Sequence, residues 1–160
     1  MRIREKVLPK DSLDTAQSLN DLAVLYSNQG TYERAEALFT RALAIREKML
    51  GPKHLDTART LENLGVLYNE QGSYSKAESL LKRALSAQTD LERPDRPETA
   101  RLLSNLAALY SYRGAYDKAK PFLTRALAIR KALIGSEHQD TALNLYNLAA
   151  LYATLGDHTR

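Results

Sequence analysis

One short motif occurs four times along the chain at a constant spacing of 42 residues. It reads Asp14-Thr15-Ala16 at its first occurrence and comes back at 56–58, 98–100 and 140–142, with Glu98 in place of aspartate in the third copy. Self-similarity at a fixed spacing of roughly 20–50 residues is typical of solenoid proteins, in which each unit packs only on its neighbours. The repeat therefore predicts a fold that presents an extended surface, and a function that this surface carries.

The same offset relates residues throughout each unit. Within the second unit, Leu61, Leu64, Gly65 and Tyr68 fall on one stripe of a helix, and Gly72 supplies the left-handed position that ends it. A second amphipathic stripe follows from Tyr74, so each unit is a hairpin of two antiparallel helices, an A helix and a B helix. The main columns are Leu19, Leu61, Leu103, Leu145; Tyr26, Tyr68, Tyr110, Tyr152; Gly30, Gly72, Gly114, Gly156; and Ala35, Ala77, Ala119.

This pattern resembles the tetratricopeptide repeat, whose usual period is about 34 residues. The long form of the repeat, seen over residues 42–58, is similar to the repeats of kinesin light chains and their prokaryotic relatives. The resemblance implies an all-α, right-handed superhelix of antiparallel helix hairpins. It also implies a scaffold or adaptor for protein–protein interaction, with cargo or partner recognition like that of kinesin light chains.

The repeat frame predicts how the chain is organised, as a single tetratricopeptide domain fragment over 1–160. Complete repeats are expected at 13–54, 55–96 and 97–138, and 139–160 is expected to hold an A helix only. Residues 1–10 are predicted to be the remnant of a preceding B helix and loop, because Ile3-Arg4-Glu5-Lys6 lies one period before Ile45-Arg46-Glu47-Lys48. An A helix without its B helix leaves an apolar stripe uncovered, so we expect self-association through the exposed terminal helices.

Composition argues against several other classes of function. The chain has no cysteine, and its net charge of +4 comes from basic residues interleaved with acidic ones. We therefore expect no enzyme, no cofactor, no metal site, no nucleic-acid partner and no membrane segment, in a cytoplasmic protein. His54 and His138 lie two repeats apart, too far to share a metal, and are expected beside the N-terminus of the following A helix.

In the families that this chain resembles, the A helices line a concave groove that binds extended peptides. The resemblance and the A-helix register together give the candidate peptide-binding residues Asn63, Asn105, Asn147, Asp21, Asn20, Arg59, Arg101, Val66, Tyr112 and Tyr146.

Three of these candidates form a column of asparagines at one register, Asn63, Asn105 and Asn147. Asparagine is a poor residue in the middle of a helix, but its amide can pair with both the C=O and the N–H of a peptide backbone. The matching residues of the resembling families hold peptide backbone. The alternative is that these amides bond to neighbouring helices within the solenoid. Asp21 occupies the same column without the amide donor.

Arg59 and Arg101 precede the asparagines by one helical turn and would suit acidic residues of the ligand, which the resembling light chains prefer. The alternative is pairing with Glu62 or with partners on other helices. Tyr112 and Tyr146 fall outside the structural columns and predict an apolar pocket between the third and fourth units, unless they pack on one another or on the adjacent helix.

Two prolines suggest local departures from the repeat. The second connection reads Glu92-Arg93-Pro94 and has no glycine, so the second B helix is expected to stop by about Leu91. Pro121 lies near the start of the third B helix and predicts a mild bend rather than a break.

Two other functions stay open at this point. The repeats could be a structural spacer or assembly arm, or the sensor arm of a bacterial signalling protein. Repeated asparagine and arginine on the inner face favour peptide binding, because a spacer does not need them.

Overall fold

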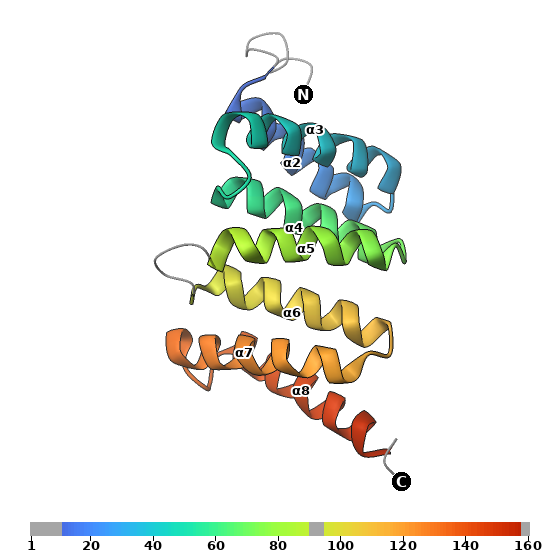
Figure 1. Cartoon of the computed structure of the whole chain (residues 1–160), viewed down its shortest axis with the longest axis vertical. Coiled ribbons are helices and arrows are strands. Elements are labelled where there is room, and N and C mark those ends of the chain that lie inside the picture. Colours follow the sequence, from blue (N-terminus) through green and yellow to red (C-terminus); the bar gives the residue numbers. More distant parts are fainter. Residues whose placement is uncertain (1–10, 90–94, 158–160) are drawn as a thin grey trace. The chain divides into compact units, whose positions relative to one another are not determined.

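The computed structural model describes residues 11–89 and 95–157, and every regular element in these stretches is an α-helix. Contacts divide the chain into two compact units, Met1–Gln88 and Thr89–Arg160. The first unit holds α2 (Leu13–Asn28), α3 (Tyr32–Leu50), α4 (Leu55–Glu70) and, except for its last residue, α5 (Tyr74–Thr89). The second holds α6 (Pro97–Tyr112), α7 (Tyr116–Ile134) and α8 (Gln139–Asp157) (Figure 1).

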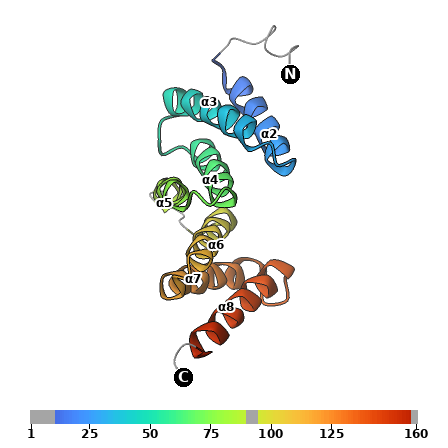
Figure 2. The same ribbon diagram turned by 90° about the vertical axis from the view of Figure 1, so that its right-hand side faces the viewer.

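The helices follow the predicted repeat. The A helices α2, α4, α6 and α8 begin at Leu13, Leu55, Pro97 and Gln139, each 42 residues after the last. α2 packs on α3 and α6 packs on α7 as antiparallel pairs, and α8 packs on α7 (Figure 2). The predicted all-α repeat solenoid is confirmed.

Small residues let the paired helices approach one another, as the sequence predicts. A Cβ added at Gly65 of α4 would come within 2.8 Å of Leu81 Cγ on α5. In the first hairpin, Ala16 and Leu19 of α2 pack with Ala42 and Ile45 of α3 in one fully apolar cluster. This contact between small and large side chains repeats along the chain because the small and the large columns both recur.

The tyrosine column ties each A helix to a neighbouring B helix. Tyr68 Oη donates to Glu36 Oε1 of α3 at 2.7 Å, and Lys76 Nζ lies 4.8 Å from the centroid of the Tyr68 ring. The hydrogen bond to this carboxylate, with a smaller effect of burial, raises the pKa of Tyr68 to about 12. In the second unit, Tyr110 stacks on Phe122 of α7 with 5.6 Å between the ring centroids.

Three glycines turn the chain between the helices of a pair. Gly30, Gly72 and Gly114 have φ values of 72°, 72° and 69°, a left-handed conformation that suits glycine. The residue after each glycine donates its N–H back to the tyrosine carbonyl, as Thr31 N does to Tyr26 O at 2.9 Å. The fourth A helix was predicted to close at Gly156-Asp157-His158, and α8 ends at Asp157, although Gly156 is helical and is not among the glycines with a positive φ. A glycine permits a left-handed turn but does not impose one.

The longer connections lead from each B helix to the next A helix. Thr57 Oγ1 donates to Gly51 O at 2.9 Å, and Thr141 Oγ1 makes the same bond to Gly135 O at 2.8 Å. The predicted stop of the second B helix near Leu91 falls in 90–94, outside the described residues. The predicted remnant of a B helix at 1–10 also lies outside the described residues. α7 passes Pro121 without a break, as expected for a proline near a helix start.

Two further findings apply to the described stretches only. None of their helices combines the length and the apolar character that crossing a bilayer requires. None of their His, Cys, Asp and Glu side chains gather in groups of three or more that could hold a metal ion.

Candidate functional site

In the first unit, α2 and α4 lie side by side and are joined by polar side chains one repeat apart. Arg59 Nη2 donates to Gln17 Oε1 at 2.5 Å, and Asn63 Nδ2 donates to Asn20 Oδ1 at 3.2 Å. These bonds put the predicted groove columns on one surface. We call it the first A-helix face; it consists of Gln17, Asp21 and Val24 on α2 and of Arg59, Asn63 and Val66 on α4.

A buried arginine lies beneath the first A-helix face and donates a hydrogen bond to one of its residues. Arg46, on α3, is 2% exposed, and its Nη1 donates to Asp56 O at 3.0 Å and to Thr60 Oγ1 at 2.5 Å. Its Nη2 donates to Gln17 Oε1 at 2.7 Å. Burial, with the nearby Arg59 cation, lowers the pKa of Arg46 from its ordinary value. One guanidinium therefore holds α2, α3 and α4 together beneath the face.

Arg59 is already engaged in this network. Its Nη2 contacts Asp56 Oδ1 at 3.1 Å, in addition to Gln17. Gln17 in turn donates its Nε2 to Asp21 Oδ1 at 2.6 Å. The interhelix pairing considered for Arg59 therefore occurs with Gln17 of α2, and Asp56 of α4 itself is a second partner, whereas Glu62 is buried. A ligand carboxylate would have to exchange with Asp56.

The asparagines of the first unit also contact one another. Asn20 is 3% exposed and accepts from Asn63, so its side chain orients Asn63 and is not open to a ligand. Asn63 is half-buried, and its Oδ1 can accept a hydrogen bond from a peptide N–H. The alternative that the asparagines bond to neighbouring helices therefore holds for Asn63 Nδ2, which donates to Asn20. Contact with peptide backbone stays a prediction.

In the second unit, the corresponding surface consists of Arg101, Asn105, Ala108 and Tyr112 on α6 and of Asn147 and Ala150 on α8. We call it the second A-helix face. Ser104 Oγ donates to Asn144 Oδ1 across the two helices at 3.2 Å. Asn147 is exposed, and Asn105 is half-buried. A hollow of about 430 Å³ opens here and is lined by Tyr112, Ala108, Asn147 and Ala150, among others.

The predicted pocket between the third and fourth units is thus present with one of its two tyrosines. Tyr112 lines the hollow and is 71% exposed, whereas Tyr146, 72% exposed, is not among the lining residues. Tyr146 therefore does not line this hollow, which corrects the prediction that it completes this pocket.

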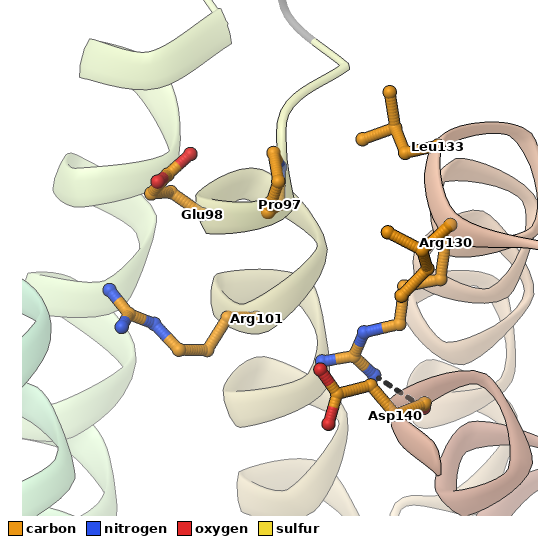
Figure 3. Close-up of a pocket in the computed structure, with 7 residues that line it drawn as sticks. Pro97, Glu98, Arg101, Arg130, Leu133 and Asp140 are labelled. Carbon is orange, nitrogen blue, oxygen red and sulfur yellow. Dashed lines mark hydrogen bonds between the residues drawn. The ribbon is translucent and has the colours of Figure 1, made fainter. Parts of the chain in front are cut away.

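Arg130 occupies the position of Arg46 in the second unit but is held less tightly. Its Nη1 lies 3.4 Å from Asp140 O and 3.4 Å from Ser104 Oγ. Figure 3 shows Arg130 beside Asp140, with Arg101 extending in another direction from α6. In the second unit the position of the acceptor Gln17 is taken by Arg101, which cannot accept a hydrogen bond. Arg101 and Arg130 are among the residues that line a hollow of about 260 Å³.

The two loop histidines begin A helices, as predicted. His54 Nδ1 accepts from Asp56 N at 3.1 Å, and His138 Nδ1 accepts from Asp140 N at the same distance. An imidazole acceptor here satisfies one of the amides that a helix start leaves unpaired.

The hydrogen bond between Arg46 and Gln17 beneath the first A-helix face was not predicted from the sequence. A signal existed, because the column Arg46, Gln88, Arg130 places a long polar residue on an otherwise apolar stripe. Such a residue can be buried only if hydrogen bonds compensate for its desolvation. Its partners, however, lie on other helices and could not be read from the column.

Comparisons with known proteins agree with this architecture. The family model described as tetratricopeptide repeat matches residues 1–48, 14–90, 88–132 and 98–160. Among solved structures, BtubC (BKLC) from P. vanneervenii is similar with a TM-score of 0.86 and 26% sequence identity. That match covers 97% of this chain and 62% of that chain, so this chain spans less than two thirds of that relative.

A candidate kinesin light chain from Podosopora anserina with nearly identical TPR-like repeats is also similar. One of its structures has a TM-score of 0.82 and 25% identity, covering 99% of this chain and 74% of that chain. A second has a TM-score of 0.80 and 25% identity, covering 99% and 75%. A comparison with curated proteins gave no match.

Proposed function

Because this chain belongs to the tetratricopeptide repeat family, we propose that it binds an extended segment of a partner protein along its A-helix faces. The repeats and the kinesin-light-chain-like structural neighbours make the chain a protein-interaction scaffold. The repeat fold is typically a non-catalytic scaffold for protein interaction. What the proposal adds is the mode of binding, the surface that is used and the chemistry of the ligand.

The observation that carries the proposal is the amide column at a single register of the A helices. Asn147 is exposed and Asn63 is fixed by Asn20, so two amides lie on A-helix surfaces with their orientation limited by helix geometry. A primary amide can donate to a peptide C=O and accept from a peptide N–H. Such pairing holds an extended backbone without reading its side chains, and recurs once per repeat.

The ligand is proposed to carry acidic residues. Arg59 and Arg101 are exposed cations on the faces that carry the asparagines, and arginine pairs with carboxylates through two parallel hydrogen bonds. In the first unit the ligand carboxylate would replace Asp56 on Arg59. Because these arginines are exposed to solvent, added salt should weaken binding of such a ligand.

A peptide array probed with the full chain tests this function. Ten-residue peptides that contain two or more aspartates or glutamates should be enriched among the binders. Their affinity, measured by fluorescence anisotropy, should fall as the salt concentration rises from 50 to 500 mM (roughly a threefold fall in Debye length). An array without binders, or binding that is unaffected by Arg59→Ala and Arg101→Ala, would contradict the proposal.

Two other roles are distinguished by the same array. A spacer or assembly arm, or the sensor arm of a signalling protein, would leave the faces without a peptide ligand or filled by a segment of its own protein. We place the interaction in the cytoplasm, where kinesin-light-chain-like partners would be met.

We also propose that the chain associates with a second copy through α8. No charged residue lies between Asp140 and Asp157, and Leu143, Leu145, Tyr146 and Tyr152 are all exposed large side chains. Two such helices could pack without opposing like charges, and apolar surface of this kind marks association sites.

Changing Leu145 and Tyr152 together to glutamate should abolish this association, because two carboxylates would be buried against an apolar helix. Sedimentation velocity over a concentration series measures it. Thr124→Glu with Ala128→Glu, on exposed positions of α7, is the matched control and should leave association unchanged. A wild-type chain that stays monomeric at the highest concentration would disprove the contact.

A further inference from the structure

The hollow of about 260 Å³ in the second unit lies between α6, α7 and the start of α8. Arg101 of α6 and Arg130 of α7 line it with two guanidinium groups. Glu98 and Asp140 line it as well, each in the first turn of its helix. The positive end of the helix dipole compensates a carboxylate in a first turn, so neither carboxylate depends on the arginines for its countercharge.

The first unit shows what an arginine at the register of Arg130 contacts when its hydrogen bonds are complete. Arg46 donates to three acceptors, and one of them, Gln17 Oε1, also accepts from Arg59. One neutral oxygen thus lies between two guanidinium groups. In the second unit the register of Gln17 holds Arg101, so a positively charged donor takes the place of this acceptor.

The hydrogen bonds around Arg130 are consistent with a shortage of acceptors. Its bonds to Asp140 O and Ser104 Oγ are both 3.4 Å long, whereas those of Arg46 are between 2.5 and 3.0 Å. Asn144 bonds to the same Ser104 through its Oδ1 and is 1% exposed, yet its Nδ2 has no hydrogen-bond partner among the described residues. Donors are therefore in excess of acceptors in this cluster.

We propose that this hollow is a binding site for an oxyanion of the phosphate type, held by Arg130 and Arg101. A phosphate oxygen would take the role that Gln17 Oε1 has in the first unit. A carboxylate has only two oxygens, whereas a phosphate group has at least three and can present separate edges to two guanidinium groups on different helices. Figure 3 shows Arg101 directed away from Arg130, as expected for two like charges, and a bound anion would draw the long side chain of Arg101 back.

This site goes beyond the proposed binding of acidic peptides. None of the three column asparagines lines the hollow, and Arg130 belongs to neither A-helix face. Arg101 is shared with the proposed peptide surface, so a change at Arg130 distinguishes the two functions. Free phosphate and a phosphorylated side chain of a partner offer the same chemistry, and the probes are chosen to separate them.

The first probe is inorganic phosphate alone, titrated at constant ionic strength and followed by isothermal titration calorimetry. The second is a short peptide with one phosphoserine and no other acidic residue, compared with its unphosphorylated form by fluorescence anisotropy. The variants are Arg130→Gln, which removes one guanidinium, and Arg101→Gln, which restores the neutral acceptor of the first unit. Lys131→Gln is the matched control, because Lys131 is an exposed cation beside Arg130 that does not line the hollow.

Phosphate should bind the wild-type chain saturably, and each of Arg130→Gln and Arg101→Gln should weaken binding at least about tenfold, because charge-assisted hydrogen bonds are lost. Arg101→Gln should also raise the melting temperature, since Arg130 gains an acceptor within the protein. Lys131→Gln should bind phosphate as the wild-type chain does. If the phosphopeptide binds at least about tenfold more tightly than phosphate, the ligand is a phosphorylated side chain, and equal affinities identify the free ion; both results support the site.

Absence of saturable binding of both probes would overturn the inference. Equal losses for Arg130→Gln and Lys131→Gln would also overturn it, because they would show attraction by net charge alone. The proposed function is scored separately, since Arg130→Gln should leave the Kd of an unphosphorylated acidic peptide unchanged. Failure of that peptide to bind the wild-type chain would contradict the proposed function without affecting the phosphate site.

Discussion

Replacing Arg46 with alanine should lower the free energy of unfolding by about 3 kcal/mol. The guanidinium is buried and donates to Asp56 O, Thr60 Oγ1 and Gln17 Oε1 on two other helices. Removing it leaves these acceptors without their charged donor and opens a cavity between α2, α3 and α4. The effect is large because one side chain satisfies groups from two neighbouring repeats.

Urea denaturation followed by circular dichroism measures this loss. Arg130→Ala is the matched control, since Arg130 shares the register but is half-buried with two contacts of 3.4 Å, and should cost about 1 kcal/mol or less. Arg46→Gln should fall between the two, because Gln88 stands at this register in the neighbouring repeat and is buried there. Equal losses for Arg46→Ala and Arg130→Ala would show that the buried network does not hold the first unit together.

Much of the fold could be predicted because the repeat imposes the same local conditions several times. The glycine column gave the turns at Gly30, Gly72 and Gly114, and the offset gave the starts of the A helices. Gly156 shows the limit of this reasoning, because it shares the column but is not among the glycines with a positive φ.

The candidate site was only partly predictable. The columns placed Asn63, Asn147 and Tyr112 on A-helix surfaces, because helix periodicity determines which residues share a face. They could not show that Asn20 is buried under Asn63, or that Arg59 bonds to Gln17. Such pairing depends on the distance between neighbouring helices, which side-chain volumes set and which a column of residues does not contain. Tyr146 was misjudged for the same reason.

Changing Asn63, Asn105 and Asn147 together to alanine should weaken peptide binding by at least about thirtyfold. Each amide is expected to make one or two hydrogen bonds to peptide backbone, each worth about 1 kcal/mol. The variant should stay folded. Loss of the Asn63 donor leaves Asn20 Oδ1 unpaired and costs about 1 kcal/mol, and the better helix propensity of three alanines offsets a similar amount.

The control for this variant carries three matched changes on B helices, Thr40→Ala, Ser86→Ala and Thr124→Ala, all at exposed positions. Like the asparagine variant, this control loses three polar side chains, but none of them lies on the A-helix faces. Asn147→Ala alone separates the effect on binding from the effect on stability, since Asn147 is exposed. Asn63, by contrast, donates a hydrogen bond to Asn20 on another helix, which its replacement removes.

The most direct test of the peptide-binding account is the Kd of one array-selected acidic peptide, measured by fluorescence anisotropy for the wild-type chain, the asparagine variant and the B-helix control. The account predicts a loss of at least about thirtyfold in the asparagine variant, with melting temperature and B-helix control affinity unchanged. An asparagine variant that binds the peptide as tightly as the wild-type chain does would contradict it.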